Sequence, residues 1–346
     1  MNSSRPISQL ILCNIKASMR EPEAIFWTYG FPLLMIVCLG IAFDTSAPQQ
    51  QLVDVVDGLG SEQILEALSD DKQFRVFEGS EDEVLERLKR NRTQIVVKAA
   101  PDGSVEYFFD PTNPDARIAR GIVDDTLQKA AGRADARPVT DETVTAPGSR
   151  YVDFLVPGLI GLNLMGGGMW GVGFSLVDMR IKKLLKRMLG TPMKRYQFLA
   201  AMVGTRALFF IPEAFALLLV AKLIFGVPIV GTIPAIILVA FCGMSAFAGL
   251  GLLAASRAQR IESISGIMNV VMLPMWLCSG VFFSNERFPA IMQPFIQALP
   301  LTQLINALRA VILEGQGIID QAFPLIILAA WAGVTFLVAL KIFRWN

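Results

Sequence analysis

Long runs of apolar residues alternate with shorter polar connections along most of the chain. A helix that crosses a membrane needs about 20 mostly apolar residues, and six segments reach that length. They are Ile25–Phe43, Val152–Val177, Leu199–Phe225, Ile233–Ala254, Ile264–Phe283 and Ala322–Phe343. The pattern therefore predicts an α-helical polytopic membrane protein with six transmembrane helices.

A polar block at residues 44–150 lies between the first and second predicted helices. Three short runs in it, Val53–Asp57, Gln94–Lys98 and Val105–Phe109, are typical of strands. Ser80-x-x-Glu83 is a capping box that opens a helix, and a further helix is expected from Pro114 to Lys129. We predict a small α/β domain inserted between transmembrane helices 1 and 2. It is either a folded spacer or a docking surface or lid.

Composition and charge support a membrane protein and give it an orientation. The chain is 53% hydrophobic with a mean hydropathy of +0.50, and only 18% of its residues are charged. Residues 44–150 carry a net charge of −8 and the remainder +9, with seven bases between Asp178 and Phe198. Because basic loops face the cytoplasm, we expect a cell-membrane protein with both termini cytoplasmic. Residues 44–150 would then be extracytoplasmic.

Several classes of chemistry are excluded or not supported. The chain has no histidine, which excludes histidine triads and histidine-ligated zinc. Its four cysteines have no metal or redox spacing, so we expect no metal site. We also expect no catalytic residue in this chain. The stretch Gly166–Gly173 has G-x-G-x-x-G spacing but no preceding strand, so we interpret Gly167-x-x-x-Gly171 as a helix contact surface. No phosphate loop occurs, so no ATPase activity is expected in this chain. No nucleic-acid partner is expected either.

The basic segment "DMRIKKLLKRMLGTPMKR" follows the second predicted helix. Its apolar residues recur at helical spacing: Ile181, Leu184, Leu185, Met188 and Leu189. The opposite face carries Lys182, Lys183, Lys186 and Arg187. Such a helix either lies on anionic lipid or fits a groove on a cytoplasmic partner. Pro6–Glu21 is a second amphipathic stretch, and residues 1–23 are expected to form a connecting helix before a first transmembrane helix at 24–43.

The third predicted helix contains the charged residues Arg206, Glu213 and Lys222. Each charge near the bilayer centre costs about 3 kcal/mol on insertion scales. Arg206 and Lys222 lie near the ends, where long side chains reach the interface. Glu213 lies near the middle, directly after Pro212, and about 10 Å from Arg206 on a similar face. Glu213 is either a protonated residue facing other helices or a group of the translocation path, to which Arg206 would also belong.

Three stretches, in order along the six predicted helices, resemble permeases of the ABC-2 type exporter family. They are "REPEAIFWTYGFPLLMI", "FLVPGLIGLNLM" with the loop ending "MLGTPMKRYQFLAAM", and "LPMWLCSGVFFSNERFPAIMQPFIQALPLTQLINALRAVI". The third stretch is the most specific, through Ser279, Gly280, Pro289, Pro300 and Arg309. The resemblance implies that this stretch is the fifth span followed by an outer re-entrant segment at residues 284–321, whose short helices, matched by Phe288–Ile312, dip back into the membrane.

The resemblance also implies partners. Two permease copies, identical or related, would pair and bind separate cytoplasmic ABC ATPase subunits, which hold ATP and Mg. Within residues 151–346, Ile181–Leu189 would be the coupling helix of a cytoplasmic loop at 178–198. Family members carry Gly-Thr where this chain has Lys183 and Leu184, so we expect an ATPase with a matching acidic surface or a non-identical permease partner. An extracytoplasmic adaptor and membrane lipid are further expected partners.

These observations predict the transmembrane permease subunit of an ATP-driven exporter. Its expected substrate is a hydrophobic or amphipathic compound, drug-like or lipid, moved outward. The alternative is a membrane anchor or assembly factor whose extracytoplasmic domain recruits partner proteins without transport. No paired acids, Ser/Lys pair or metal-ligand set in the predicted helices supports an intramembrane enzyme.

Overall fold

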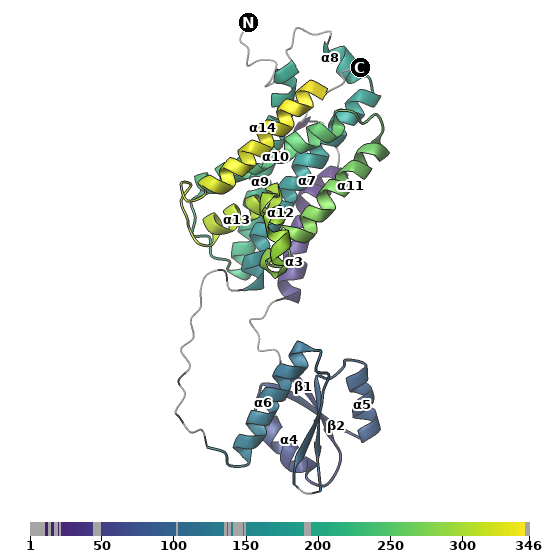
Figure 1. Cartoon of the computed structure of the whole chain (residues 1–346), viewed down its shortest axis with the longest axis vertical. Helices are drawn as coiled ribbons and strands as arrows, with labels where there is room; N and C mark the ends of the chain where they lie inside the picture. Colours follow the sequence, from purple (N-terminus) through teal and green to yellow (C-terminus); the bar gives the residue numbers. More distant parts are fainter. Residues whose placement is uncertain are drawn as a thin grey trace. The chain divides into compact units, whose positions relative to one another are not determined.

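The chain forms two compact units (Figure 1). The computed structural model describes residues 11–12, 15–16, 20, 22–43, 50–101, 103–134, 137, 140, 148, 150–189 and 195–342. Thr45–Val144 form one unit, named here the α/β unit. Met1–Asp44 and Thr145–Asn346 together form the other, named the helical unit. The α/β unit is therefore an insertion in the sequence of the helical unit.

The helical unit contains five long helices and several short ones among the described residues. Its first part is Pro22–Ile25 (α2), a π-helical turn at Phe26–Gly30 (η1) and Phe31–Ala42 (α3). The long helices are Tyr151–Ile181 (α7), Arg195–Phe225 (α9), Ile233–Ala255 (α10), Ile261–Cys278 (α11) and Ala322–Ile342 (α14). The other short helices are Leu184–Leu189 (α8), Asn285–Arg287 (η2), Ala290–Met292 (η3), Gln293–Ala298 (α12) and Pro300–Ile312 (α13).

Five described helices, α7, α9, α10, α11 and α14, have the length and composition to cross a membrane. The number becomes six if Ala290–Ala298 and Pro300–Ile312, which meet at 84°, form one broken span. The first predicted helix is shorter than expected. Its apolar part, Phe26–Ala42, is only about 25 Å long, so it is not counted among the helices long enough to cross a membrane. The prediction of a mostly helical membrane protein is confirmed, with five or six candidate spans.

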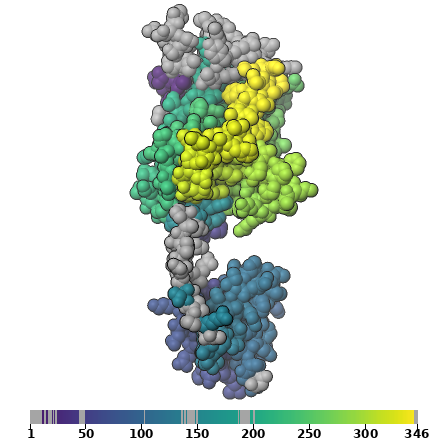
Figure 2. Space-filling view, turned by 60° about the vertical axis from the view of Figure 1, so that its left-hand side comes forward, coloured from purple at the N-terminus to yellow at the C-terminus, as the bar shows by residue number. Residues whose placement is uncertain are grey.

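The core of the helical unit is the contact between α7 and α10, with α14 packed on α10. Figure 2 shows α14, in yellow, on the outer surface of this unit. Glycines bring the α7 and α10 backbones together. A Cβ on Gly251 would lie 2.7 Å from the carbonyl oxygen of Met169, and one on Gly168 would lie 2.7 Å from the Cβ of Phe247. Both values are far below van der Waals contact, so only glycine fits at either position.

The α/β unit contains a four-stranded sheet in the order β2-β1-β3-β4. Its strands are Gln51–Val56 (β1), Phe74–Gly79 (β2), Ile95–Ala99 (β3) and Val105–Phe108 (β4). β1 pairs in parallel with β2 and β3, and β3 pairs antiparallel with β4. Val53, Val55, Ile95 and Val97 form a core with Ser61–Ser69 (α4) and Pro114–Ala130 (α6). The opposite face packs on Glu81–Lys89 (α5) through Val84.

The three predicted strands and the two predicted helices of this unit are confirmed, whereas β2 and α4 were not predicted. The edge strand β2, "FRVFEG", pairs with β1 alone and has several exposed side chains. Its apolar and polar residues therefore give only a weak strand pattern in the sequence. The short helix α4 has only Ser61, Ile64 and Leu68 buried. Ser80 is the N-cap of α5 as expected, but its side chain makes no capping hydrogen bond.

Tyr107 joins β4 to α6, because its hydroxyl donates to Asp124 Oδ1 at 3.0 Å. Burial, followed by the hydrogen bond and the charge of Asp124, raises the pKa of Tyr107 from 10.0 to about 12. Between these two pH values the unfolded chain ionises at this tyrosine and the folded chain does not. The contribution of Tyr107 to stability is therefore present below pH 10 and lost as pH rises toward 12.

We expect an ultraviolet absorbance titration, taken as the difference between wild type and Tyr107→Phe, to show a tyrosine ionising near pH 12. Titration of the Tyr107 difference signal near pH 10 would contradict this contact. As a check on the folded state, the same titration in denaturant should bring the transition back to the ordinary tyrosine range.

Candidate functional site

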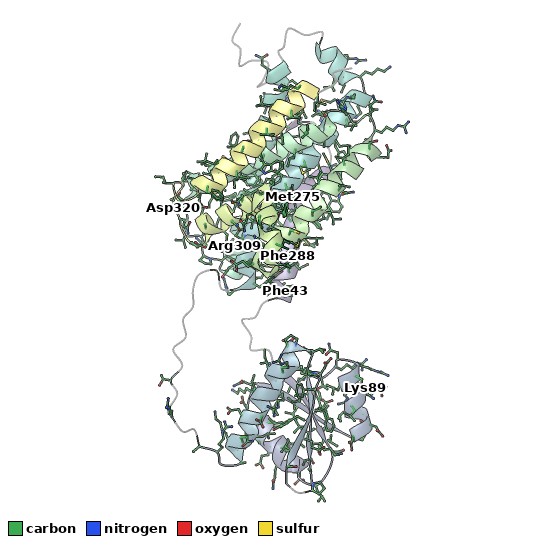
Figure 3. All side chains as sticks on the ribbon, viewed as in Figure 1. Phe43, Lys89, Met275, Phe288, Arg309 and Asp320 are labelled. Carbon is green, nitrogen blue, oxygen red and sulfur yellow. The ribbon has the colours of Figure 1, made fainter. Side chains whose placement is uncertain are left out.

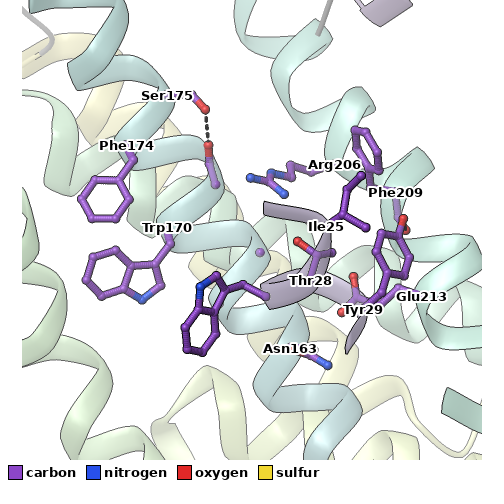
Figure 4. Close-up of a pocket in the computed structure, with 14 residues that line it drawn as sticks. Ile25, Thr28, Tyr29, Asn163, Trp170, Phe174, Ser175, Arg206, Phe209 and Glu213 are labelled. Carbon is purple, nitrogen blue, oxygen red and sulfur yellow. Dashed lines mark hydrogen bonds between the residues drawn. The ribbon is translucent and has the colours of Figure 1, made fainter. Parts of the chain in front are cut away.

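A cavity of about 840 Å³ lies in the helical unit between η1, α7 and α9 (Figure 4). Its aromatic lining consists of Trp27, Tyr29, Trp170, Phe174 and Phe209. Its polar lining consists of Thr28, Asn163, Ser175, Arg206 and Glu213. Small-molecule sites are typically about 300–1,000 Å³ and mostly apolar, with a few polar groups. The size and lining of this cavity therefore suit a small amphipathic molecule.

Glycines of α7 create the space on one wall. A Cβ on Gly166 or Gly167 would meet no atom within 4 Å, whereas one on Gly171 would collide with the guanidinium of Arg206. Within the described residues, Gly171 therefore contacts a side chain of α9 as a helix contact requires, whereas Gly167 contacts no other helix. The close helix contact is made by Gly168, and the neighbouring glycines instead open the cavity and leave room for Arg206.

Arg206 and Glu213 come from one face of α9 and both line the cavity (Figure 4). Glu213 is 7% exposed. Among the described residues, the two side chains attract each other electrostatically but form no direct ion pair or hydrogen bond, as expected for residues two helical turns apart. The structure thus brings both predicted residues to one cavity. Their role in translocation stays a prediction.

The third wall is the π-helical turn η1, which the sequence analysis did not predict. The hydroxyl of Tyr29 donates to the carbonyl oxygen of Phe209 at 3.1 Å and so joins η1 to α9. Single π-turns inside helices occur often at functional sites. The aromatic run "FWTYG" and the lone amide Asn163 are visible in the sequence, but neither indicates a π-turn or a shared cavity.

The basic segment after α7 is not one helix. Ile181 is the last residue of α7, Lys182 and Lys183 form a turn, and α8 begins at Leu184. The predicted helix Ile181–Leu189 is therefore wrong in its first turn, and Ile181 does not share a helix with Leu185. Leu185 is 2% exposed, which places one apolar residue of the predicted face inside the unit. The side chains of Lys186 and Met188, and residues 190–194, lie outside the described part.

The turn explains how this chain departs from the family pattern. Lys183 has a φ of +56°, a left-handed conformation that glycine adopts without strain. The resemblance places Gly-Thr at Lys183 and Leu184. The backbone therefore keeps the geometry that glycine would favour while presenting an exposed basic side chain. Lys182 pairs with Asp178 at 2.7 Å, and Arg187 is exposed.

Arg180, on the last turn of α7, binds the end of α10. Its guanidinium donates to the carbonyl oxygens of Ala255 at 2.9 Å and Ser256 at 3.3 Å, and also to that of Ala258. A cation beside the carboxyl end of a helix stabilises the exposed carbonyls. One base of the predicted coupling loop therefore has a structural contact inside the helical unit.

The predicted outer residues form a second cluster. Arg309 on α13 donates to the carbonyl oxygens of Phe154 at 3.3 Å and Gly280 at 3.2 Å, and its guanidinium lies 3.9 Å from the Phe154 ring centroid. Ser279 is fully buried beside Gly280, which turns with a φ of +80°. Arg309 and Phe288 lie toward the same end of the helical unit (Figure 3).

The two predicted prolines of this segment begin or precede helices. Pro289 is the N-cap residue of η3, and Pro300 is the first residue of α13. The structure therefore brings Ser279, Gly280 and Arg309 together and gives the prolines a local role. Within the part of the chain that the structure describes, no group of three or more Cys, Asp and Glu residues has metal-site geometry.

Comparison with known proteins agrees with this architecture. A family model described as ABC-2 family transporter protein matches residues 22–341. The chain is 26% identical over 257 residues to ABC transporter G family member 20 of Dictyostelium discoideum, covering 71% of this chain and 35% of that protein. It is 25% identical over 174 residues to inner membrane transport permease YhhJ of Escherichia coli strain K12, covering 50% of this chain and 46% of that permease.

A second permease of the same strain, inner membrane transport permease YadH, is 27% identical over 166 residues, covering 47% of this chain and 63% of that permease. The chain spans less than two thirds of the length of each of these relatives. The family model, in contrast, covers most of the chain and includes the long helices described above except for the last residue of α14. The chain therefore belongs to the ABC-2 family of transporter proteins, as a multi-pass membrane component.

Proposed function

We propose that this chain is the transmembrane permease subunit of an ABC exporter, which moves a hydrophobic or amphipathic substrate outward. The cavity between η1, α7 and α9 carries this proposal, because it has the volume and mixed lining of a small-molecule site. Family membership favours this function over the membrane anchor. Drug-like compounds and lipids are the substrate classes to test.

The position of the cavity supports outward movement. Its α7 residues lie between Asn163 and Ser175, and its α9 residues lie between Arg206 and Glu213. The α7 stretch has its midpoint closer to Ile181, which precedes α8, than to Tyr151. The α9 stretch lies near the middle of its helix, and the η1 residues lie at the start of the first apolar helix. In the proposed orientation, α8 faces the cytoplasm, so a substrate would enter the cavity from the cytoplasmic half of the membrane.

In this proposal, ATP and Mg are held by separate cytoplasmic ABC ATPase subunits, which bind α8 and the turn before it. A second permease copy, identical or related, completes the transporter. Residues 44–150 are extracytoplasmic and offer a docking surface for an adaptor, with lipid around the helices. The 84° bend between Ala290–Ala298 and Pro300–Ile312 supports a re-entrant outer segment.

Affinity purification from native membranes in mild detergent, followed by mass spectrometry, tests the proposed function. We expect a stoichiometric ABC ATPase subunit, and an ATPase rate that responds to lipophilic compounds. Recovery of this chain without any ATPase, together with outer-face proteins, would favour the membrane anchor.

Changing Lys182, Lys183, Lys186 and Arg187 together to Gln is expected to weaken ATPase association. The measurement is the amount of ATPase recovered with the variant, because removal of four charges weakens a steered, charge-complementary contact. Arg257→Gln with Arg260→Gln is the matched control, since both bases are exposed in the connection between α10 and α11. Equal ATPase recovery with the fourfold variant and wild type would show that these four charges do not contribute to ATPase association.

A further inference from the structure

Two side chains of opposite charge line the cavity, and within the described residues they act on each other through space without a direct ion pair. Arg206 and Glu213 are seven residues apart on α9, which places their Cα atoms about 10 Å apart on the same face. Both line the cavity and attract each other electrostatically, but the described part of the chain gives neither side chain a direct hydrogen bond or ion pair. Charged groups inside a membrane bundle are costly unless something pairs with them.

The two charged side chains lie on the α9 side of the cavity, across from Trp170 and Phe174 (Figure 4). Arg206 is next to Gly171, where a side chain would displace its guanidinium. Because α7 and α9 run in opposite directions, Glu213 is level with the part of α7 that contains Asn163. The Nδ2 atom of Asn163 is buried without a hydrogen-bond partner. The amide can present its oxygen or its nitrogen to a ligand, so the part of the cavity near Glu213 offers a further polar group to a ligand.

Aromatic side chains supply the apolar surface of the cavity. The rings of Trp170 and Phe174 have centroids 4.5 Å apart, and Trp27 is 63% exposed. Tryptophan faces attract ammonium groups and also bury apolar chains. An apolar chain can therefore lie against the rings while charged groups reach the side chains of α9.

We propose that this cavity binds zwitterionic amphiphiles, with the anionic group at Arg206 and the cationic group at Glu213. A singly charged amphiphile would contact one of the two side chains and leave the other without a direct contact to an opposite charge. A neutral amphiphile would satisfy neither. This inference deepens the proposed function by naming the substrate class, and rests on that function only where transport is concerned.

The test is binding of four probes with the same decyl chain to the purified chain in a neutral maltoside detergent, below the concentration at which each probe forms micelles. The probes are a sulfobetaine, a sulfate, a trimethylammonium and a maltoside. Tryptophan fluorescence reports binding, because Trp27 and Trp170 line the cavity. We expect the sulfobetaine to bind most tightly, and tighter binding of the sulfate or the trimethylammonium to wild type would overturn the proposal.

Charge variants give the sharper result. Loss of one charged contact is expected to weaken sulfobetaine binding about tenfold. Glu213→Gln should then prefer the sulfate, and Arg206→Gln should prefer the trimethylammonium. Such a change of preference does not follow from a merely structural role. Lys222→Gln is the matched control, because Lys222 is an exposed charge of the same helix outside the cavity lining.

One further variant keeps the result interpretable. Arg206→Lys retains the charge and should keep the wild-type preference, which guards against a folding defect in Arg206→Gln. Unchanged probe preference in both Gln variants would overturn the proposal. Because these measurements need no ATPase, they can fail while an ATPase still co-purifies, and the reverse also holds.

Zwitterionic amphiphiles have two sources, the membrane lipid and dissolved compounds. Native mass spectrometry of the purified chain distinguishes them. Retained phosphatidylethanolamine that is lost in Glu213→Gln would identify a lipid ligand. Sulfobetaine binding to a chain without retained lipid would identify a dissolved one. Either result supports the proposal, and retention of phosphatidylglycerol in preference to phosphatidylethanolamine contradicts it.

Discussion

Gly251→Leu is expected to prevent stable packing of the helical unit. A Cβ at this position would lie 2.7 Å from the carbonyl oxygen and 2.9 Å from the Cα of Met169. Both are backbone atoms of α7, so no side-chain rotation relieves the collision. Overpacking in a core typically costs about 1–3 kcal/mol, and we expect about 3 kcal/mol here because two helix backbones must separate.

Thermal unfolding in mild detergent, followed by size-exclusion chromatography, measures this effect. Gly333→Leu is the matched control, since a Cβ on Gly333 in α14 would meet no atom within 4 Å. The control should unfold at the wild-type temperature, and Gly251→Leu should unfold well below it or fail to purify. Equal unfolding temperatures for the two variants would show that α7 and α10 are not in close contact.

Arg180→Leu is expected to be the second most damaging single change. The guanidinium donates to three carbonyl oxygens at the end of α10, and leucine leaves them without these donors. A hydrogen bond to a charged group is worth about 1.5–3 kcal/mol. Because Arg180 is only half-buried and water replaces part of the contact, we expect a loss of about 2 kcal/mol in the free energy of unfolding.

The control for this prediction is Arg257→Leu, which removes an exposed arginine from the connection after α10. The same unfolding measurement should show a clear loss for Arg180→Leu and little change for Arg257→Leu. A restored unfolding temperature in Arg180→Lys would indicate that charge alone suffices, whereas a partial recovery fits the forked geometry of arginine. Equal stability of Arg180→Leu and wild type would show that Arg180 does not stabilise the end of α10.

Part of the candidate site was predictable, because charge in an apolar helix is a strong local signal. Arg206 and Glu213 were singled out on that basis, and both line the cavity. The remaining walls were not predictable. Tyr29 and Trp170 are ordinary aromatic residues of apolar segments, and their position depends on which helix faces they share with α9. The π-turn at Phe26–Gly30 has no established sequence signal.

The basic segment after α7 shows a different limit of prediction from sequence. The periodicity of Ile181, Leu184 and Leu185 predicted one helix, but the chain turns at Lys183 with a φ of +56°. A lysine in that conformation costs about 1–2 kcal/mol locally, so local propensity argues against it. Leu185 packs in the core, and Arg180 donates a hydrogen bond to the end of α10. Both contacts are with residues far away in the sequence, so a local pattern cannot reveal them.

The sequence by itself determined the mostly helical membrane class, the inserted α/β unit, the family resemblance and the charged residues of α9. These follow from hydrophobic runs, strand patterns and charge placement, each of which acts over a few turns of chain. Only the tertiary structure decided which glycines bring helices together and which leave space. Gly168 and Gly167 are neighbours with the same local chemistry, but they point to different sides of α7. One meets α10 and the other faces the cavity, because packing against other helices assigns each face its partner.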